Sequence, residues 1–420
     1  MLSTLTNTLE LEKIISFGRV SSRDRSIRSC FLREIFAVAV LSAVATTPSW
    51  AQGMDDPSTQ YSKEAMQQAL ETRQQYDVHG LRFDTDKSTL QPGAEPLLDD
   101  IATALKNFPD WSLRIVGHTD ASGSAETNER LSLERADTIK VALVDRGIDP
   151  DRLMAGGAGQ DRPIASNETE EGKALNRRVE LLRVTNSPEA RKLLKAMSDY
   201  LAAQKALSFS YDANLQVVTN TEQKLGLASS GTVILSRPDK VHTTRSGGFV
   251  ESEALFDGKM LTLVGKNVNK YTQVEMPGTV DQLIDELKDK HGLPLPGADL
   301  LMTNAYDELM QGVYDSKDLG SGVVNGHECD SLAFRKDDVD FQIWVAHGEQ
   351  PFPCRLAITS REVKGAPEYT VQIRDWKSGD AVMLGDFAFK NPTNAEKIDV
   401  NDLKQNLSEL PGNLVLGDGK

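Results

Sequence analysis

The sequence predicts an α+β protein of two domains, a small α/β sandwich followed by a large, mostly antiparallel sheet with helical inserts. The chain has 420 residues, and at roughly 100–200 residues per domain this length suits two or three cores. Helix-like and strand-like patterns alternate over residues 76–185, whereas short period-two segments dominate from about residue 190. We therefore expect a leader over 1–51, a linker or short helix over 52–75, and domains over 76–185 and 190–417.

Composition excludes several classes of protein. Hydrophobic residues make up 39% of the chain and charged residues 26%, which is too apolar for a disordered chain. The formal net charge of −15 argues against nucleic acid or an anionic membrane surface as the main partner. Three cysteines and six histidines, without a CxxC or HxxxH arrangement, give little support for a structural zinc site. We expect no metal ion and no cofactor.

The first 51 residues have the order of a secretory signal peptide. Ile35 to Trp50 carries no charge, and Ser49-Trp-Ala51 supplies small residues at a cleavage site. Five arginines precede the apolar run: Arg19, Arg23, Arg25, Arg28 and Arg33. The apolar run is short for a helix that spans ~30 Å of hydrocarbon, although an uncleaved anchor is the alternative. We expect cleavage after Ala51 and an exported protein.

Within residues 76–185, hydrophobic periodicity predicts two helices and three strands. The helices are expected over Glu95–Phe108 and Ser124–Arg146, and the second is stopped by Gly147. In the first helix the apolar residues share one face: Leu97, Leu98, Ile101, Ala104 and Leu105. The strands are expected over Gly80–Phe83, Ser112–Val116 and Arg178–Arg183.

The second domain begins with a helix from Glu189 to about Leu207. From Phe209 to Val217, apolar and polar residues alternate as in a half-buried strand. Asp257-Gly258 predicts a type I′ hairpin. Further short strands are expected over Thr232–Ser236, Met260–Val264, Tyr271–Met276, Phe341–Ala346, Leu356–Thr359 and Tyr369–Ile373, with helical inserts over Val280–His291 and Ala298–Met310.

Two cysteines, Cys329 and Cys354, remain after cleavage of the leader. They flank a segment that has the pattern of a β-hairpin, in a protein expected to enter an oxidising compartment. We expect a disulfide between them, with two buried free thiols as the alternative.

The residues with the clearest chemistry follow the second strand of the first domain. Asp120 lies in a Gly- and Ser-rich turn, and Asn128, Leu131 and Arg135 share one face of the helix that follows. A strand-turn-helix unit that doubles back can place Asp120 beside Arg135. The carboxylate can then take an ammonium group and the guanidinium a carboxylate, which suits a zwitterionic ligand. The alternative is an Asp–Arg ion pair that satisfies itself.

Residues 76–185 resemble the OmpA-like peptidoglycan-binding domain. The resemblance is carried by Phe83-Asp-Thr-Asp, Gly117-His-Thr-Asp120, Asn128, Leu131-Ser132, Arg135-Ala136, Gly157-Ala-Gly159 with Pro163, and Asn176-Arg-Arg-Val179. It implies that Asp120 and Arg135 grip the diaminopimelate of the peptidoglycan stem peptide. It also implies that Thr119, Asn128, Leu131 and Arg178 line this site.

Residues from about 190 to 417 resemble a predicted periplasmic domain related to the lipoprotein carriers LolA and LolB. The resemblance is carried by the leading helix, the alternating strands, Gly326-His-Glu-Cys329, Gln342-Ile-Trp344 and Pro353-Cys-Arg-Leu-Ala-Ile-Thr359. It implies a half β-barrel with an apolar cavity for acyl chains. The alternative is a closed sandwich whose apolar face is only a core.

Catalysis has little support in the sequence. His118 and Asp120 lack a third metal ligand at a useful spacing, and the thiol beside His327 is expected to lie in a disulfide. We expect a non-enzymatic periplasmic protein, associated with the cell wall or outer membrane. In it, peptidoglycan binding tethers a domain that binds lipid, lipoprotein or another envelope protein. A periplasmic hydrolase localised by its first domain and a purely protein-binding scaffold are the alternatives.

Overall fold

A computed structural model describes residues 62–79, 81–84, 87–248, 250–291, 295–400 and 402. The expected signal peptide lies outside these residues. The chain divides into two compact units between Val184 and Thr185, and each unit is described by itself. No helix in the described part of the chain is both long enough and apolar enough to cross a membrane.

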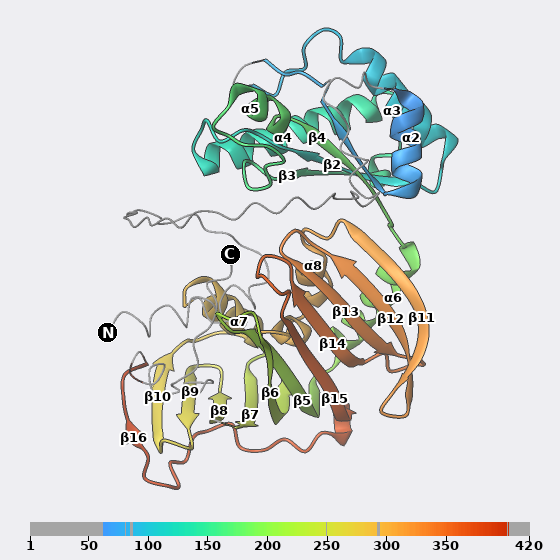
Figure 1. The fold of residues 1–420 in the computed structure, drawn as a ribbon. Coiled ribbons are helices and arrows are strands. Elements are labelled where there is room, and N and C mark those ends of the chain that lie inside the picture. Colours follow the sequence, from blue (N-terminus) through green and yellow to red (C-terminus); the bar gives the residue numbers. More distant parts are fainter. Residues whose placement is uncertain are drawn as a thin grey trace, which may run out of the picture. The chain divides into compact units, whose positions relative to one another are not determined.

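The N-terminal unit is a four-stranded sheet with helices packed on it (Figure 1). The strand order is β1-β4-β2-β3, and β2 and β3 are the parallel pair. Leu98, Ile101 and Leu105 of α3 lie in one buried cluster with Leu113 and Ile115 of β2, as the apolar face of this helix predicts. The elements are α2 (Lys63–Thr72), β1 (Gln75–Val78), α3 (Glu95–Asn107), β2 (Ser112–Gly117), α4 (Ala125–Val144), η2 (Pro150–Arg152), β3 (Leu153–Gly157), α5 (Glu170–Asn176) and β4 (Val179–Val184).

One strand of this unit differs from the sequence-based prediction. The first strand is β1, which pairs with β4 from Gln75 to Val78, and it is not the segment ending at Phe83. Phe83 instead forms an isolated bridge with Leu90, and the backbone of Gln91 donates to the carbonyl of Arg82 at 2.9 Å. The described residues 83–84 and 87–90 belong to no helix and to no strand of the sheet, and this connection between β1 and α3 is called the 83–90 loop below.

The C-terminal unit is built on one 12-stranded sheet. Its order is β11-β12-β13-β14-β15-β5-β6-β7-β8-β9-β10-β16, with β11 and β16 at the two edges. The strands are β5 (Ala206–Val218), β6 (Lys224–Ser236), β7 (Lys240–Gly247), β8 (Glu251–Phe256), β9 (Met260–Gly265), β10 (Lys270–Glu275), β11 (Asp315–Val324), β12 (His327–Arg335), β13 (Val339–Ala346), β14 (Pro353–Ser360), β15 (Glu368–Ser378) and β16 (Glu396–Lys397). This agrees with the expected α+β class, while the half-barrel form implied by LolA and LolB stays a prediction.

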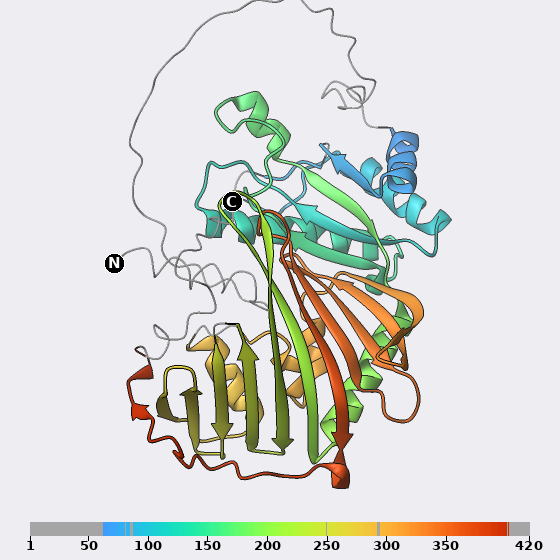
Figure 2. The ribbon, with the colours of Figure 1, turned by 60° about the horizontal axis from the view of Figure 1, so that its bottom comes forward.

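Helices cover one face of the large sheet. Figure 2 shows them on the same side, with the chain after β15 running past the strand ends to β16. The helical elements are α6 (Pro188–Ala203), α7 (Val280–Asp289), η3 (Ala298–Leu301) and α8 (Ala305–Met310), and a short turn η4 (Gly379–Ala381) follows β15. Leu194 and Met197 of α6, Leu283 of α7 and Leu309 of α8 lie in one buried cluster with strand residues such as Phe341. The apolar face of the sheet is therefore filled by the chain's own helices.

The insert between β10 and β11 is closed by polar contacts at both ends. Asp281 at the start of α7 accepts from the backbone N–H of Thr303 at 3.2 Å. Arg237 donates to the carbonyl of Leu301 at 2.8 Å, and Lys288 pairs with the buried Asp299. The contacts of Asp281 with Thr303 and of Lys288 with Asp299 join α7 to the segment of η3 and α8, and Arg237 ties this segment to the turn between β6 and β7.

The turn between β8 and β9 is a hairpin, as Asp257-Gly258 predicts, but its type differs. Type I′ needs a positive φ at both central residues, and of this pair Gly258 has one (+93°). Asp257 instead accepts from the backbone N–H groups of Lys259 and Met260 through its side chain, at 3.0 and 2.9 Å. The carboxylate thus forms a turn that tolerates an ordinary φ at Asp257.

Candidate functional site

The candidate site is built at the end of β2. Beyond Gly117 the chain turns through His118, Thr119 and Asp120 before α4 begins at Ala125. The backbone N–H of Thr119 donates to the carbonyl of Gly159 at 2.8 Å. The side-chain amide of Asn128 donates to the carbonyl of Asp120 at 3.1 Å. The turn is therefore fixed from both sides, by the loop after β3 and by α4.

Small residues bring α4 directly onto the sheet. A Cβ added to Gly117 would lie 2.1 Å from the carbonyl oxygen of Ser132, and one added to Gly157 would lie 2.6 Å from the Ser132 hydroxyl. That hydroxyl donates to the carbonyl of Glu129 at 2.7 Å and accepts from the backbone N–H of Gly159 at 2.9 Å. These contacts explain why the motifs carry glycine and serine, and they set the distance between the turn and the helix.

Asp120 is a buried, ionised carboxylate with two fixed donors. It is 9% exposed and accepts from the backbone N–H of Ser122 at 2.9 Å. Its second oxygen accepts from the guanidinium of Arg177 at 2.5 Å, and this arginine side chain is 46% exposed. Burial alone raises the pKa of Asp120, but the bonds from Arg177 and Ser122 outweigh it, so the pKa lies below its ordinary value.

The face of α4 expected at the site carries Asn128, Leu131 and Arg135. Asn128 and Leu131 are buried, and Asn128 also donates to the side chain of Gln160 at 2.7 Å. The guanidinium of Arg135 lies over the ring of Phe83, 5.1 Å from its centroid, and its Nε donates to the carbonyl of Lys87 at 3.0 Å. The ion pair of Asp120 is thus with Arg177, whereas Arg135 contacts the 83–90 loop.

Buried polar atoms without a hydrogen-bond partner lie at the same turn. They include the hydroxyl oxygen of Thr119, the Nδ1 atom of His118 and the Nη1 and Nε atoms of Arg178. Arg178 pairs with Asp77 at 3.5 Å and donates through Nη2 to the carbonyl of Arg162 at 3.2 Å. Its own carbonyl accepts from the backbone N–H of His118 at 3.0 Å, which ties it to the turn. A buried polar group without a partner costs about 1–3 kcal/mol, so these atoms are suited to receive a ligand.

Sequence reasoning missed Arg177. The residue that positions it is Asn176, which is fully buried at the end of α5. The Asn176 side chain accepts from the backbone N–H groups of Ile164 and Ala165 at 2.8 and 3.0 Å, and donates to the carbonyl of Ala165 at 2.9 Å. This locks the end of α5 against residues 164–167 and places Arg177 beside Asp120. The motif Asn176-Arg-Arg-Val179 contains both arginines, but the prediction assigned a role in the site to Arg178 and not to Arg177.

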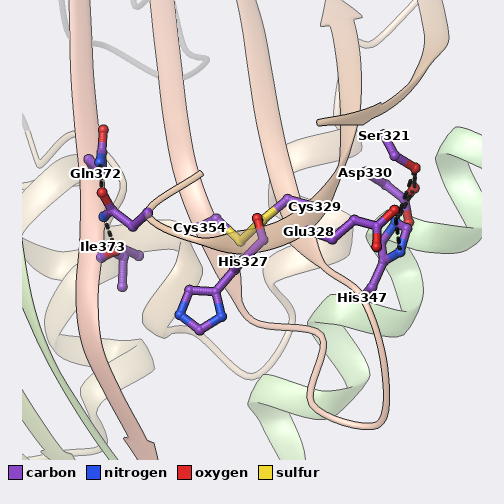
Figure 3. Close-up of a disulfide and its surroundings, with 10 residues drawn as sticks. Ser321, His327, Glu328, Cys329, Asp330, His347, Cys354, Gln372 and Ile373 are labelled. Carbon is purple, nitrogen blue, oxygen red and sulfur yellow. Dashed lines mark hydrogen bonds and ion pairs between the residues drawn. A yellow bond between two sulfur atoms is a disulfide. The ribbon is translucent and has the colours of Figure 1, made fainter. Parts of the chain in front are cut away.

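In the C-terminal unit, Cys329 of β12 is bonded to Cys354 of β14, as expected (Figure 3). The thiol beside His327 is therefore consumed by this bond. Nearby, His347 lies 2.7 Å from Asp330 and 3.8 Å from Glu328. The hydrogen bond to Asp330 raises the pKa of His347. Among the described residues, no three His, Cys, Asp or Glu side chains are grouped so as to hold a metal ion.

Two family models match the chain. The model described as "OmpA family" matches residues 82–177, and the one described as "Predicted periplasmic protein (DUF2092)" matches residues 190–401. The second match covers just over half of the chain. The resemblance of the N-terminal unit to OmpA-like domains is thus confirmed, whereas the relation of the C-terminal unit to LolA and LolB is not confirmed.

Known proteins are similar to this chain over about a quarter of its length. The "Probable lipoprotein YiaD" of Escherichia coli is 42% identical over 103 residues, which are 24% of this chain and 47% of that protein. The "Peptidoglycan-binding protein ArfA" of Mycobacterium bovis is 41% identical over 102 residues, 24% of this chain and 31% of that protein. The matched segment thus spans less than half the length of these relatives. The solved peptidoglycan-associated lipoprotein of Burkholderia pseudomallei is 32% identical, with a TM-score of 0.24, and the match covers 24% of this chain and 87% of that one.

Proposed function

Because this chain belongs to the family of predicted periplasmic proteins designated DUF2092 and also carries an OmpA-family domain, we propose that it binds peptidoglycan non-covalently and holds its C-terminal domain at the cell wall. The family description and the outer membrane and lipoprotein relatives place the protein in the periplasm, in association with the cell wall or outer membrane. The proposed activity is binding, without catalysis.

The observation that carries the proposal is the set of buried polar groups at the end of β2. Asp120 supplies a fixed negative charge for a ligand ammonium, next to Ser122 and Arg177. The Thr119 hydroxyl and the Nη1 group of Arg178 add buried donors without a hydrogen-bond partner, while the rest of the Arg178 guanidinium contacts Asp77 and the carbonyl of Arg162. Arg135, on the helix that follows the same turn, supplies a planar fork that suits a carboxylate.

This donor and acceptor set favours diaminopimelate as the recognised part of the stem peptide. The free head of its side chain is a zwitterion, with an ammonium group for Asp120 and a carboxylate for Arg135. Lysine in the same position has the ammonium group but no carboxylate. The proposal therefore requires that Asp120 recognises both kinds of stem peptide, whereas Arg135 distinguishes them.

The test is sedimentation of the mature protein with purified sacculi. Losing one member of a desolvated charge pair costs about 2–5 kcal/mol, so Asp120→Ala and Arg135→Ala should each lose well over tenfold in affinity. A matched control is the pair of Arg374 and Asp212 in the C-terminal unit, which are 2.7 Å apart and whose replacement by alanine should not affect sedimentation. Wild-type binding should also be weaker to lysine-type wall. If both site variants sediment like the wild type, the proposal is wrong.

For the C-terminal domain, the packing favours a protein-binding scaffold over an open lipid carrier. Leu194, Leu283 and Leu309 already fill the apolar face of the large sheet, and the insert is pinned by the pair of Asp281 and Thr303. An acyl chain would have to displace these helices. We expect no lipid in solvent extracts of the purified protein by mass spectrometry, and no binding of fluorescent acyl probes. Co-purified lipid in a fixed ratio to protein would instead favour the carrier.

A further inference from the structure

Arg135 is held by the 83–90 loop through two different contacts. The guanidinium lies over the ring of Phe83, with its carbon 5.1 Å from the ring centroid. Its Nε donates to the backbone carbonyl of Lys87 at 3.0 Å. Both partners lie about 50 residues before Arg135 in the sequence. The orientation of this side chain is therefore set by the loop as well as by α4.

Each contact constrains a different freedom of the guanidinium. An arginine side chain has many rotamers, and a cation over an aromatic face is attracted to it by the quadrupole of the ring. The guanidinium carbon lies over the ring face, so the N–H groups that point away from the ring remain available for hydrogen bonds. The bond from Nε to the carbonyl of Lys87 then restricts the rotation of the guanidinium.

Phe83 is itself well anchored for such a role. It is half-buried and packs against the hydrophobic core of the N-terminal unit together with Leu90, its partner in the isolated bridge. One side of the residue is thus held by the core, while its ring also meets Arg135. A leucine could fill the same part of the core, but it would offer no aromatic face to the guanidinium.

We propose that Phe83 is a positioning residue of the peptidoglycan site, whose ring holds the Arg135 guanidinium in the orientation that binds the ligand carboxylate. This rests on the proposed function, since Arg135 must be the group that binds this carboxylate. The ring therefore sets selectivity for diaminopimelate over lysine without touching the ligand.

The experiment compares ring-retaining with ring-removing variants of the mature protein. Phe83→Tyr and Phe83→Trp keep the aromatic face, whereas Phe83→Leu and Phe83→Met keep only apolar volume. Dissociation constants are measured by calorimetry for a stem tripeptide ending in diaminopimelate and for its lysine counterpart. The matched control is Trp344→Leu in the C-terminal unit, which removes a cation–π contact of similar geometry, with Arg355 5.0 Å from the ring centroid.

Ring removal should weaken binding of the diaminopimelate peptide by about three- to tenfold and leave binding of the lysine peptide unchanged. Tyr and Trp should restore wild-type affinity to within about twofold. In the Arg135→Ala background, Phe83→Leu should have no further effect, because the group that it positions is gone. Trp344→Leu should bind like the wild type. If the Phe83→Leu variant does not fold, Phe83→Met provides the same comparison.

Failure of the proposed function and failure of this inference give different results. If Arg135→Ala binds both peptides like the wild type, the proposed function of Arg135 is wrong and this inference falls with it. If Arg135→Ala loses the preference for diaminopimelate but the Leu and Met variants keep it, Phe83 is only a packing residue. Equal losses of both peptides in the Leu and Met variants would also overturn the inference, because a positioning role predicts selective loss.

Discussion

The disulfide between Cys329 and Cys354 should carry a large part of the stability of the C-terminal unit. It connects β12 and β14, which are separated in the sheet by β13. Neighbouring strands lie about 4.8 Å apart, so alternate strands are about 9.6 Å apart in a regular sheet. The two Cα atoms are nevertheless 7.0 Å apart, at a place where the register between β13 and β14 shifts after Trp344. The bulge thus brings the cysteines within bonding reach.

The size of the effect follows from the loop that the bond closes. The cysteines are separated by 25 residues, which corresponds to about 3–4 kcal/mol in the chain-entropy model. With a slope of about 3 kcal/mol per molar urea, the unfolding midpoint of this unit should fall by about 1 M on reduction. Both cysteines are buried in a cluster with Ala346 and Phe352. Replacing both by alanine should therefore cost more than reduction, because it also removes packed sulfur atoms.

Tryptophan fluorescence can report on the two units separately. Trp344 and Trp376 lie in the C-terminal unit and Trp111 in the N-terminal unit. Trp50 lies in the expected leader, so urea unfolding of a Trp111→Phe variant of the mature protein, with and without reductant, follows the C-terminal transition. A Trp344→Phe, Trp376→Phe variant follows the N-terminal one, which should not respond to reductant. Equal C-terminal midpoints under both conditions would refute the reasoning, as would two titratable thiols in the unfolded, unreduced protein.

Three further predictions concern the site and the sheet edge. Arg177 helps to hold the pKa of Asp120 below its ordinary value, so Arg177→Gln should let this carboxyl protonate at a higher pH. Sedimentation with sacculi across a pH series should then show that the variant loses binding at a higher pH than the wild type. Gly117→Ala should cost about 1–3 kcal/mol in thermal unfolding, because its Cβ would meet the Ser132 carbonyl, whereas Gly322→Ala, with nothing within 4 Å, should be neutral. The raised pKa of His347 adds stability below its unfolded value that is lost as pH rises through its folded value, so His347→Gln should flatten this part of the stability–pH curve.

The strands that the sequence predicted are those with an apolar face. Alternation from Phe209 to Val217 predicted β5, because every second residue lies in a buried apolar cluster. β7 and β11 were missed for the opposite reason. β7 reads Lys-Val-His-Thr-Thr-Arg-Ser-Gly, and β11 lies at an edge of the sheet and is mostly exposed beyond Ser316. Their pairing comes from neighbouring strands, and a local pattern of apolar residues does not encode it.

The same limit applies to the site. Local spacing correctly placed Asn128, Leu131 and Arg135 on one helix after Asp120, because helical periodicity is a local property. The partner of the Asp120 carboxylate depends instead on where distant segments meet, and Arg177 comes 57 residues later, placed by the buried amide of Asn176. The contact of Arg135 with Phe83 is also remote in sequence, and Phe83, expected at the end of a strand, lies in an isolated bridge with Leu90.

These two remote contacts give the charged groups of the site different surroundings. Asp120 is buried and accepts from a backbone N–H, so its position is fixed before a ligand arrives. Arg135 is half-exposed and held by a ring and a carbonyl, both in a loop that tolerates change better than a strand. Substitutions in the 83–90 loop should therefore alter the preference between diaminopimelate and lysine while binding through Asp120 persists. Under the proposed function, the position of the ammonium-binding Asp120 is set by the fold of the N-terminal unit. The orientation of the carboxylate-binding Arg135 depends in addition on the 83–90 loop.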